Sequence, residues 1–406
     1  MQIQPILAAL KKHRLATFLL AMEIALACAV LCNAVFMIQD RLSAMDLDSG
    51  VDEAALGTVV VTGFDAKLAN ELNARMVSGL GAIPGVESVH VVSSVPFGPQ
   101  GGVNGITLDQ EGKHVGAVVQ LYQGEPGSPQ ALGLKLVAGH LPAADDYQPI
   151  VGNDYMPLSS RVLITQALAE KLWPGQSPLG KQFWGAKYQF RVIGVVAHLS
   201  VSQYNENGEH GAEWCVFVPV RAGGQLAGTY LVRAKPQDLE RVMTAARTAV
   251  AKIAPDVVLD YADSHTIGHL RERFFKGDHA MAGLLVGIIV ALLGITAFGI
   301  VGLTSFWVAQ RHKQIGIRRA LGAARLDILR YFQTENFLIV TFGVALGMLL
   351  AIAINVGLMS TFEIPRLPLW YLPVGAIALW LLGQLAVLAP ALRAAAVPPV
   401  VATRGV

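Results

Sequence analysis

The sequence has little charge and few cysteines. Only 15% of its 406 residues are Asp, Glu, Lys or Arg, whereas an ordinary soluble domain carries about 25%. Of the 3 cysteines, Cys28 and Cys32 lie together in one apolar run, which leaves Cys215 without a partner in its own region. The low charge argues against an ordinary soluble protein, and the cysteine usage argues against a disulfide framework.

The sequence also lacks the motifs of several enzyme classes. It contains no His-Glu-x-x-His zinc motif and no Gly-x-Ser-x-Gly nucleophile elbow. Residues 175–181 fit the first seven positions of a phosphate-binding loop, but Gln182 stands where Ser or Thr should hold Mg²⁺. His265, His269 and His279 precede an apolar run, and we interpret them as solvated or interfacial. We expect no catalytic, cofactor-binding or metal-binding residue.

Long apolar runs are what the sequence does contain. Hydrophobic residues make up 53% of the chain, and they gather in four stretches, each at or near the roughly 20 residues that span a bilayer. The stretches are residues 15–38, 281–308, 337–359 and 369–392. The first exceeds the usual apolar core of a signal peptide. The pattern predicts four transmembrane helices.

Basic residues orient these helices. Residues 11–14 are basic and precede the first run, and residues 311–330 hold six Lys or Arg against one acid, Asp327. Positive loops remain in the cytoplasm. The short loop 360–368 fits the outside, and Arg393 and Arg404 fit the inside. We expect both termini in the cytoplasm.

The predicted spans leave residues 39–280 as one extracytoplasmic domain, and the composition of this region is that of a soluble globular α/β domain. Its pattern predicts strands at 58–64, 86–95 and 115–122, a helix at 65–80, and then a strand, helix and strand within 229–261. This order is close to a split ferredoxin-like unit, interrupted by a β-rich insert at about 127–224. The predicted segments are 1–38 (cytoplasmic segment and first span), 39–280, 281–308 (second span), 309–336 (cytoplasmic), 337–359 (third span), 360–368 (outer loop) and 369–406 (fourth span and C-terminus).

Three motifs resemble one known family. Residues 314–323 (QIGIRRALGA), followed by Asp327 and Glu335, resemble the coupling helix of MacB/FtsX-like (type VII) ABC transporter permeases. Residues 162–181 (VLITQALAEKLWPGQSPLGK) with 190–195 (FRVIGV) are similar to a signature of that family's periplasmic domain, and 132–140 (LGLKLVAGH) to another part of it. The family often has Glu where this chain has Gln314, which removes one charge at the expected ATPase contact and hints that the subunit is used asymmetrically.

The resemblance implies a fold, partners and a location. It implies a bacterial inner-membrane protein with four helices and a large periplasmic domain, which pairs with a second permease chain, identical or paralogous. Two separate ATPase subunits would bind ATP-Mg and move the coupling helices. A periplasmic adaptor and an outer-membrane exit duct are expected as well, and no nucleic acid. The implied ATPase-coupling residues are Gln314, Ile315, Gly316, Ile317, Arg318, Arg319, Leu321 and Gly322.

A few residues within or beside the predicted spans are further candidates for dimer contact or coupling. Glu23 is an acid in the middle of the first span, where ionisable groups are costly. It fits either helix packing or dimer contact, or else a coupling or ion role. Gly283 and Gly287 form a Gly-x-x-x-Gly motif, which allows close helix approach, either at a dimer seam or in ordinary packing. Glu335 completes this set.

Two functions remain open at this point. The first is an export permease driven by a separate ATPase. The second is a mechanotransmitting regulator that transports nothing and acts on a cell-wall enzyme or a sensor. The large outer domain with its insert favours export, because regulators of this group tend to have smaller outer domains.

Overall fold

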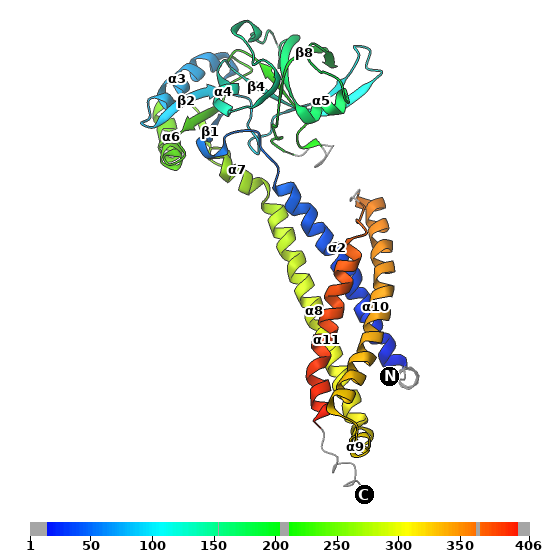
Figure 1. Ribbon diagram of the computed structural model, residues 1–406. Helices are drawn as coiled ribbons and strands as arrows, with labels where there is room; N and C mark the ends of the chain where they lie inside the picture. The colour runs from blue at the N-terminus through cyan, green and yellow to red at the C-terminus, as the bar shows by residue number, and fades with distance from the viewer. Residues whose placement is uncertain (1–13, 153, 204–210, 363–365, 397–406) are drawn as a thin grey trace. The chain divides into compact units, whose positions relative to one another are not determined.

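The computed structural model describes residues 14–152, 154–203, 211–362 and 366–396. The predicted cytoplasmic segment before Arg14, part of the predicted loop 360–368 and the predicted C-terminal segment after residue 396 lie outside the described residues. The chain forms two compact units, shown in Figure 1. The membrane unit consists of the residues up to Met45 and those from Asp278 onward; the outer unit is Asp46–Gly277.

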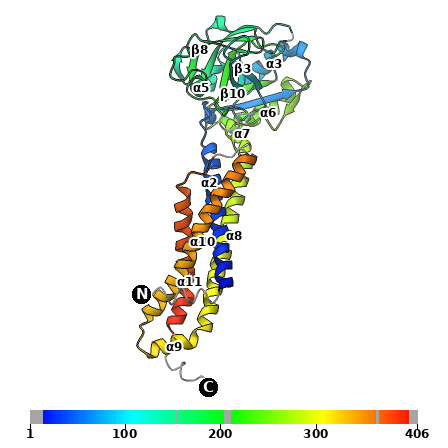
Figure 2. The same cartoon turned by 90° about the vertical axis from the view of Figure 1, so that its right-hand side faces the viewer.

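The membrane unit contains four helices long and apolar enough to cross a bilayer, which confirms the predicted number. Figures 1 and 2 show them running alongside one another. They are α2 (Arg14–Met45), α8 (Lys276–Gln310), α10 (Arg325–Phe362) and α11 (Tyr371–Ala395), with the short α9 (His312–Ala320) between α8 and α10. Each is longer than its apolar run, because backbone hydrogen bonding continues past the point where side chains become polar.

Helix α10 packs closely against α2 through two glycines. A Cβ at Gly343 would lie 2.8 Å from the Ile24 side chain, and one at Gly347 would lie 2.5 Å from Cys28 Cβ. Asn33 Nδ2 on α2 donates to the Ala351 carbonyl on α10 at 3.1 Å. Small residues that admit a neighbouring backbone, joined by a polar contact, are the usual basis of helix association in lipid.

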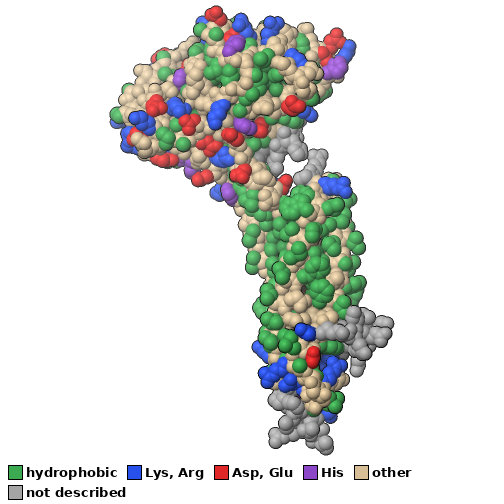
Figure 3. All heavy atoms as spheres, in the orientation of Figure 1, with side chains coloured by type: hydrophobic (Ala, Val, Ile, Leu, Met, Phe, Trp, Pro, Cys, Tyr) green, Lys and Arg blue, Asp and Glu red, His purple; other side chains and the backbone are tan. Residues whose placement is uncertain are grey.

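Helix α8 is packed far less. Thr296, Ile300, Thr304 and Trp307 are buried, but most of the other apolar side chains are open, up to 80% for Phe298. The predominantly apolar surface of the helices is visible in Figure 3. This surface fits contact with lipid or with another chain.

In the outer unit, a four-stranded antiparallel sheet has the order β11-β1-β10-β2. Helices α3 (Ala69–Gly81) and α6 (Leu239–Ile253) share its core, in which Val59 and Val61 of the sheet meet Met76 and Met243 of the helices. The strands are β1 (Leu56–Thr62), β2 (Val86–Val91), β10 (Thr229–Ala234) and β11 (Val258–Asp260). This is the predicted ferredoxin-like unit, split between β2 and β10.

The insert between β2 and β10 contains a seven-stranded sheet of order β5-β8-β6-β9-β4-β3-β7. Strand β7 also pairs with β8, so the sheet closes on itself as a small barrel. The strands are β3 (Gly102–Thr107), β4 (Val115–Gly124), β5 (Leu136–Gly139), β6 (Ser159–Thr165), β7 (Gln182–Gly185), β8 (Tyr188–Val196) and β9 (Cys215–Pro219). The helices are α4 (Ser128–Leu132) and α5 (Gln166–Leu172), and α7 (Ile267–Phe274) precedes α8. Three short 3₁₀ turns complete the unit, at Glu53–Ala55, Ala66–Leu68 and Ala144–Asp146.

One prediction is wrong here. The sequence pattern predicts that the strand at 115–122 belongs to the ferredoxin-like unit and that the insert begins at about 127. Instead β4 pairs in parallel with β9, with Leu121 opposite Val216, so the insert begins directly after β2. The alternation of a strand reveals which face is buried but not which distant strand lies beside it.

Candidate functional site

The candidate site is α9 and the turn that follows it. Gly322 has φ +97° and ends α9, while Ala323 N donates back to the Arg318 carbonyl at 3.0 Å. This is a common glycine cap. Asp327 Oδ2 then accepts from Ala324 N at 2.9 Å, at the start of α10. The Gly322 turn therefore separates α9 from α10.

One face of α9 is anchored in the membrane unit. Ile315 is buried and packs with Ile328 and Phe332 of α10 and with Ala391 and Ala394 of α11. Gly316 is buried beside it. The residues that pack against this face of α9 thus belong to two spanning helices.

The other face of α9 is open. Leu321 is 82% exposed and Ile317 is 46% exposed, and the Arg318 guanidinium lies over the Tyr331 ring at 5.2 Å. Arg319 Nη1 donates to the Ala323 carbonyl at 3.4 Å. Figure 3 shows Lys and Arg side chains gathered at this end of the helical unit. Exposed apolar groups rimmed by cations are typical of a protein contact.

A buried ion pair joins the end of α8 to α10. Arg311 Nη1 lies 2.8 Å from Glu335 Oε2, and the Glu335 side chain is only 1% exposed. The sequence singled out Glu335 but missed Arg311 as its partner. The sequence held a signal for this partner, because a carboxylate beside an apolar run is costly to bury unless a cation lies nearby, and Arg311 is in the adjacent basic segment. Together with Gln314, Ile315, Arg318, Ile328, Tyr331 and Phe332, Arg311 also lines a cavity of about 140 Å³.

The intramembrane candidates do not form one site. Glu23 on α2 lies against Gly299 of α8, where a Cβ would be 2.8 Å from Glu23 Oε2. A Cβ at Gly283 or Gly287 would meet no atom within 4 Å among the residues that the structure describes. The glycine pair that packs against another helix of the same chain is Gly343 and Gly347 on α10, which the sequence pattern did not single out.

The phosphate-loop-like segment 175–181 lies between α5 and strand β7. A phosphate-binding loop would lead into a helix. The Lys181 ammonium lies 5.3 Å from the centre of the Trp173 ring and donates to Gln176 Oε1 at 2.6 Å. The segment is therefore a turn in which Lys181 contacts two nearby residues, Trp173 and Gln176.

The histidines before α8 are engaged by their neighbours. The rings of His265 and His269 stack at 4.2 Å, and Arg247 Nη1 lies 3.3 Å from His265 Nδ1. Burial, with His269 and Arg247 nearby, lowers the pKa of His265 below its ordinary value. In the described part of the chain, no three His, Cys, Asp or Glu side chains are grouped to hold a metal ion.

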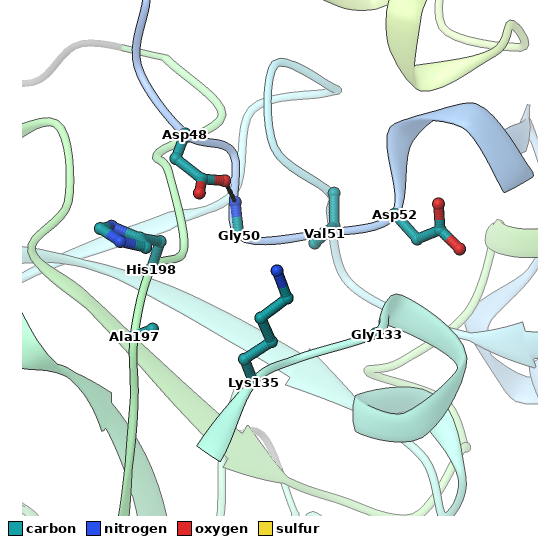
Figure 4. Close-up of a pocket in the computed structure, with 8 residues that line it drawn as sticks. All are labelled: Asp48, Gly50, Val51, Asp52, Gly133, Lys135, Ala197 and His198. Atoms are coloured by element: carbon teal, nitrogen blue, oxygen red, sulfur yellow. Dashed lines mark hydrogen bonds between the residues drawn. The ribbon is translucent and has the colours of Figure 1, made fainter. Parts of the chain in front are cut away.

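The outer unit contains a cavity of about 340 Å³ that the sequence did not suggest. Its lining residues are Asp48, Gly50, Val51, Asp52, Gly133, Lys135, Ala197 and His198. Figure 4 shows Lys135 extending toward the segment that carries Asp48 and Asp52. Asp52 is bonded to Arg233 at 2.7 Å, and His198 to Glu213 at 2.6 Å. The cavity lies between the segment that follows α2, residues 48–52, and the insert, which contributes Gly133, Lys135, Ala197 and His198.

Comparison with known families agrees with this architecture. The family described as "MacB-like periplasmic core domain" matches residues 17–249, and the one described as "FtsX-like permease C-terminal" matches residues 286–399.

Two curated relatives are both called macrolide export ATP-binding/permease protein MacB. The protein from Nitrosomonas europaea is 27% identical over 259 residues, which cover 60% of this chain and 38% of that protein. The one from Aggregatibacter actinomycetemcomitans is 26% identical over 224 residues, covering 54% and 33%. The matched region is thus about a third of these relatives' length.

Two solved structures are also similar. The periplasmic region of MacB from Actinobacillus actinomycetemcomitans has 17% identity and a TM-score of 0.36, covering 55% of this chain and 94% of that one. The extracellular domain of the ABC-type transporter YknZ, from Gram-positive bacteria, has 15% identity and a TM-score of 0.31, covering 48% and 93%. On the family matches, which together span both units, the chain belongs to the MacB/FtsX-like family of ABC transporter permeases.

Proposed function

We propose that this chain is the permease subunit of an efflux complex, in which a separate ATPase drives a conformational change of the periplasmic domain and so exports a substrate. The observation that carries the proposal is the two-sided α9. One face is anchored to α10 and α11 through Ile315, and the other presents Leu321 and basic residues. A partner that moves α9 would move the spanning helices with it.

Helix α8 provides the route outward. It has 35 residues without a break, which corresponds to about 52 Å at 1.5 Å per residue, longer than the roughly 30 Å hydrocarbon core. The Arg311–Glu335 pair holds one end, and Arg41 Nη1 meets Asp278 Oδ1 of α8 at 2.8 Å near the other. A helix held at both ends can carry a displacement as a rigid body.

The exposed face of α8 supports pairing with a second permease chain. Gly283 and Gly287 leave room for a closely packed helix, and the surrounding apolar side chains include Leu284 at 60% exposure. In the complex that we propose, two permease chains are joined along α8. Two ATPase subunits, which bind ATP-Mg, contact the cytoplasmic ends of the two permease chains at their α9 helices. The α9 residues proposed to form this contact are Gln314, Ile317, Arg318, Arg319, Leu321 and Gly322.

The proposal includes the location and the outer partners. The basic end of the helical unit lies in the cytoplasm, with both termini, and the outer unit lies in the periplasm of a bacterial inner membrane. A periplasmic adaptor and an outer-membrane duct complete the export path. The relatives are named for macrolide export, and we extend to this chain an export role but not a particular substrate.

The test uses the permease co-purified with its ATPase and reconstituted in nanodiscs. Spin labels on the outer units of the two permease chains should change their separation when ATP binds a catalytically dead ATPase. An unchanged separation would leave a static scaffold and contradict the proposal. A change of separation without any ATP-dependent substrate release, in a complex that contains a cell-wall hydrolase instead of an adaptor, would favour the regulator.

A further inference from the structure

Within the outer unit, Arg271 on α7 binds the chain segment that follows α2. Its Nη1 donates to Glu53 Oε1 at 2.6 Å, and its Nη2 donates to the Leu47 carbonyl at 2.7 Å. The side chains of Arg271 and Glu53 are each 25% exposed. Charge-assisted hydrogen bonds of this kind, partly removed from water, are among the stronger polar contacts in proteins.

The same guanidinium also lies against the insert. Its Cζ is 5.1 Å from the centre of the Phe97 ring and 5.7 Å from that of Phe275, and the Phe97 and Phe274 rings meet edge to face at 5.1 Å. Phe97 is buried and has φ +60°, a conformation that costs energy in a residue other than glycine. Its N–H donates to the Val201 carbonyl at 3.3 Å. The surrounding contacts therefore hold the Phe97 ring against the Arg271 guanidinium.

These contacts join three parts of the chain that the sequence keeps apart. Leu47 and Glu53 belong to the segment leaving α2, and α7 leads directly into α8. Phe97 belongs to the insert. The segment after α2 is itself bonded to the insert, because Ser200 N donates to the Ser49 carbonyl at 3.0 Å and Ser200 Oγ to the Asp48 carbonyl at 2.8 Å.

We propose that Arg271 is a positioning residue that makes both membrane connections of the outer unit move the insert as one body. The inference rests on the proposed function, since it assumes that force arrives through α2 and α8. With Arg271 in place, a displacement of either connection reaches Phe97 through one guanidinium. Without Arg271, the guanidinium contacts that join α7 to Leu47, Glu53 and Phe97 are lost, and the connection between α7 and the segment after α2 is weakened.

The experiment compares four variants in the reconstituted permease–ATPase complex. Arg271→Ala removes the joint. Arg271→Lys keeps the charge but lacks the planar fork that reaches two acceptors at once. Glu53→Arg combined with Arg271→Glu restores an ion pair with reversed charges. Arg75→Ala is the matched control, because Arg75 forms an exposed ion pair with Asp256 at 2.9 Å in the same unit. Spin labels are placed at Val115, an exposed residue at the start of β4 in the insert, in both permease chains.

Arg271→Ala should bind the ATPase and hydrolyse ATP as the wild type does, but most of the ATP-driven change in label separation should be lost. The reversed pair should recover part of that change, and Arg75→Ala should keep all of it. A wild-type response in both Arg271→Ala and Arg271→Lys overturns this inference and leaves the proposed function intact. An absent response in the wild type defeats the proposed function instead. If Arg271→Ala does not fold, Arg271→Lys and the reversed pair decide the outcome by the same measurement.

Discussion

At the scale of single residues, two buried or partly buried carboxylates, Glu335 and Glu125, are held by specific partners. Glu335, buried at the end of α10 nearest α9, is held by Arg311. In the outer unit, Glu125 Oε1 accepts from Val91 N at 2.7 Å and lies 3.9 Å from His90 Nδ1. Glu125 ties the stability of the outer unit to pH, because burial disfavours the ionised form of its carboxyl group.

Burial raises the pKa of Glu125 above its ordinary value of 4.5. The folded state therefore holds this proton more tightly than the unfolded state, and stability falls as pH rises from the unfolded pKa through the folded one. Glu125→Gln keeps an acceptor for Val91 N and removes the ionisation. We expect the variant to have a higher Tm than the wild type at pH 7.5, and the difference to shrink toward pH 4.

Thermal unfolding of the detergent-purified permease measures this. Glu71→Gln, on the exposed side of α3, should change Tm little at either pH. A Tm difference for Glu125→Gln that is equal at both pH values would show that ionisation of Glu125 does not affect stability.

Arg319 tests the proposed ATPase contact. Changing Arg319→Glu reverses the charge of a half-buried residue near the C-terminal end of α9, and like-charge contact at an interface costs about 1.4 kcal/mol or more, so co-purified ATPase should fall roughly tenfold. Arg393→Glu is the control, because Arg393 is an exposed cation in the last turn of α11, off α9. Equal ATPase recovery from both variants would count against α9 as the contact.

At the scale of elements, two Gly-x-x-x-Gly motifs with the same spacing have different environments. Helix α2 packs directly against Gly343 and Gly347 of α10, whereas no described residue lies within 4 Å of a Cβ at Gly283 or Gly287 of α8. The same motif thus serves packing inside the chain on one helix, and on the other is available for a second chain.

This contrast gives a paired prediction. Gly347→Leu would force the new side chain onto Cys28 and should destabilise the bundle by about 3 kcal/mol, seen as lost yield and a lower Tm. Gly287→Leu should leave the Tm of the monomer unchanged and weaken dimerisation, because close approach of two backbones is blocked. Crosslinking through cysteines placed along α8 measures the second effect. Crosslinks between chains that form through α10 or α11 and not through α8 would place the seam elsewhere.

At the scale of the whole molecule, the two units divide the task that we propose. The membrane unit presents α9 to a partner, and the outer unit contains the ferredoxin-like sheet and the barrel-like insert. Neither unit shows a nucleotide site among the residues described here, since segment 175–181 enters strand β7 and its lysine lies over Trp173.

We therefore expect the purified permease to hydrolyse no ATP until its ATPase is added. Lys181→Ala should leave the ATPase rate of the complex unchanged, because Lys181 contacts Trp173 and Gln176 rather than a phosphate site. Malachite-green phosphate release measures both. Hydrolysis by the permease alone that Lys181→Ala abolishes would establish a nucleotide site in this chain.

The sequence by itself determined the features that depend on local pattern. Four continuous apolar runs of about 20 residues have the length and pattern of spanning helices, in which every backbone group is satisfied within its own segment. The order of strands and helices on either side of the insert was sufficient to predict the ferredoxin-like unit. The basic residues after α8 were sufficient to single out α9.

Tertiary structure alone decided the features that depend on which distant segments meet. It paired β4 with β9 and gave Glu335 its partner Arg311. It packed α2 against Gly347 but placed no described residue against Gly287. It also brought Arg271 to Leu47 and Glu53. Periodicity describes one residue's relation to its near neighbours, whereas these contacts join segments whose separation in sequence leaves many partners with the same local pattern. Only the packing of the complete chain selects among them.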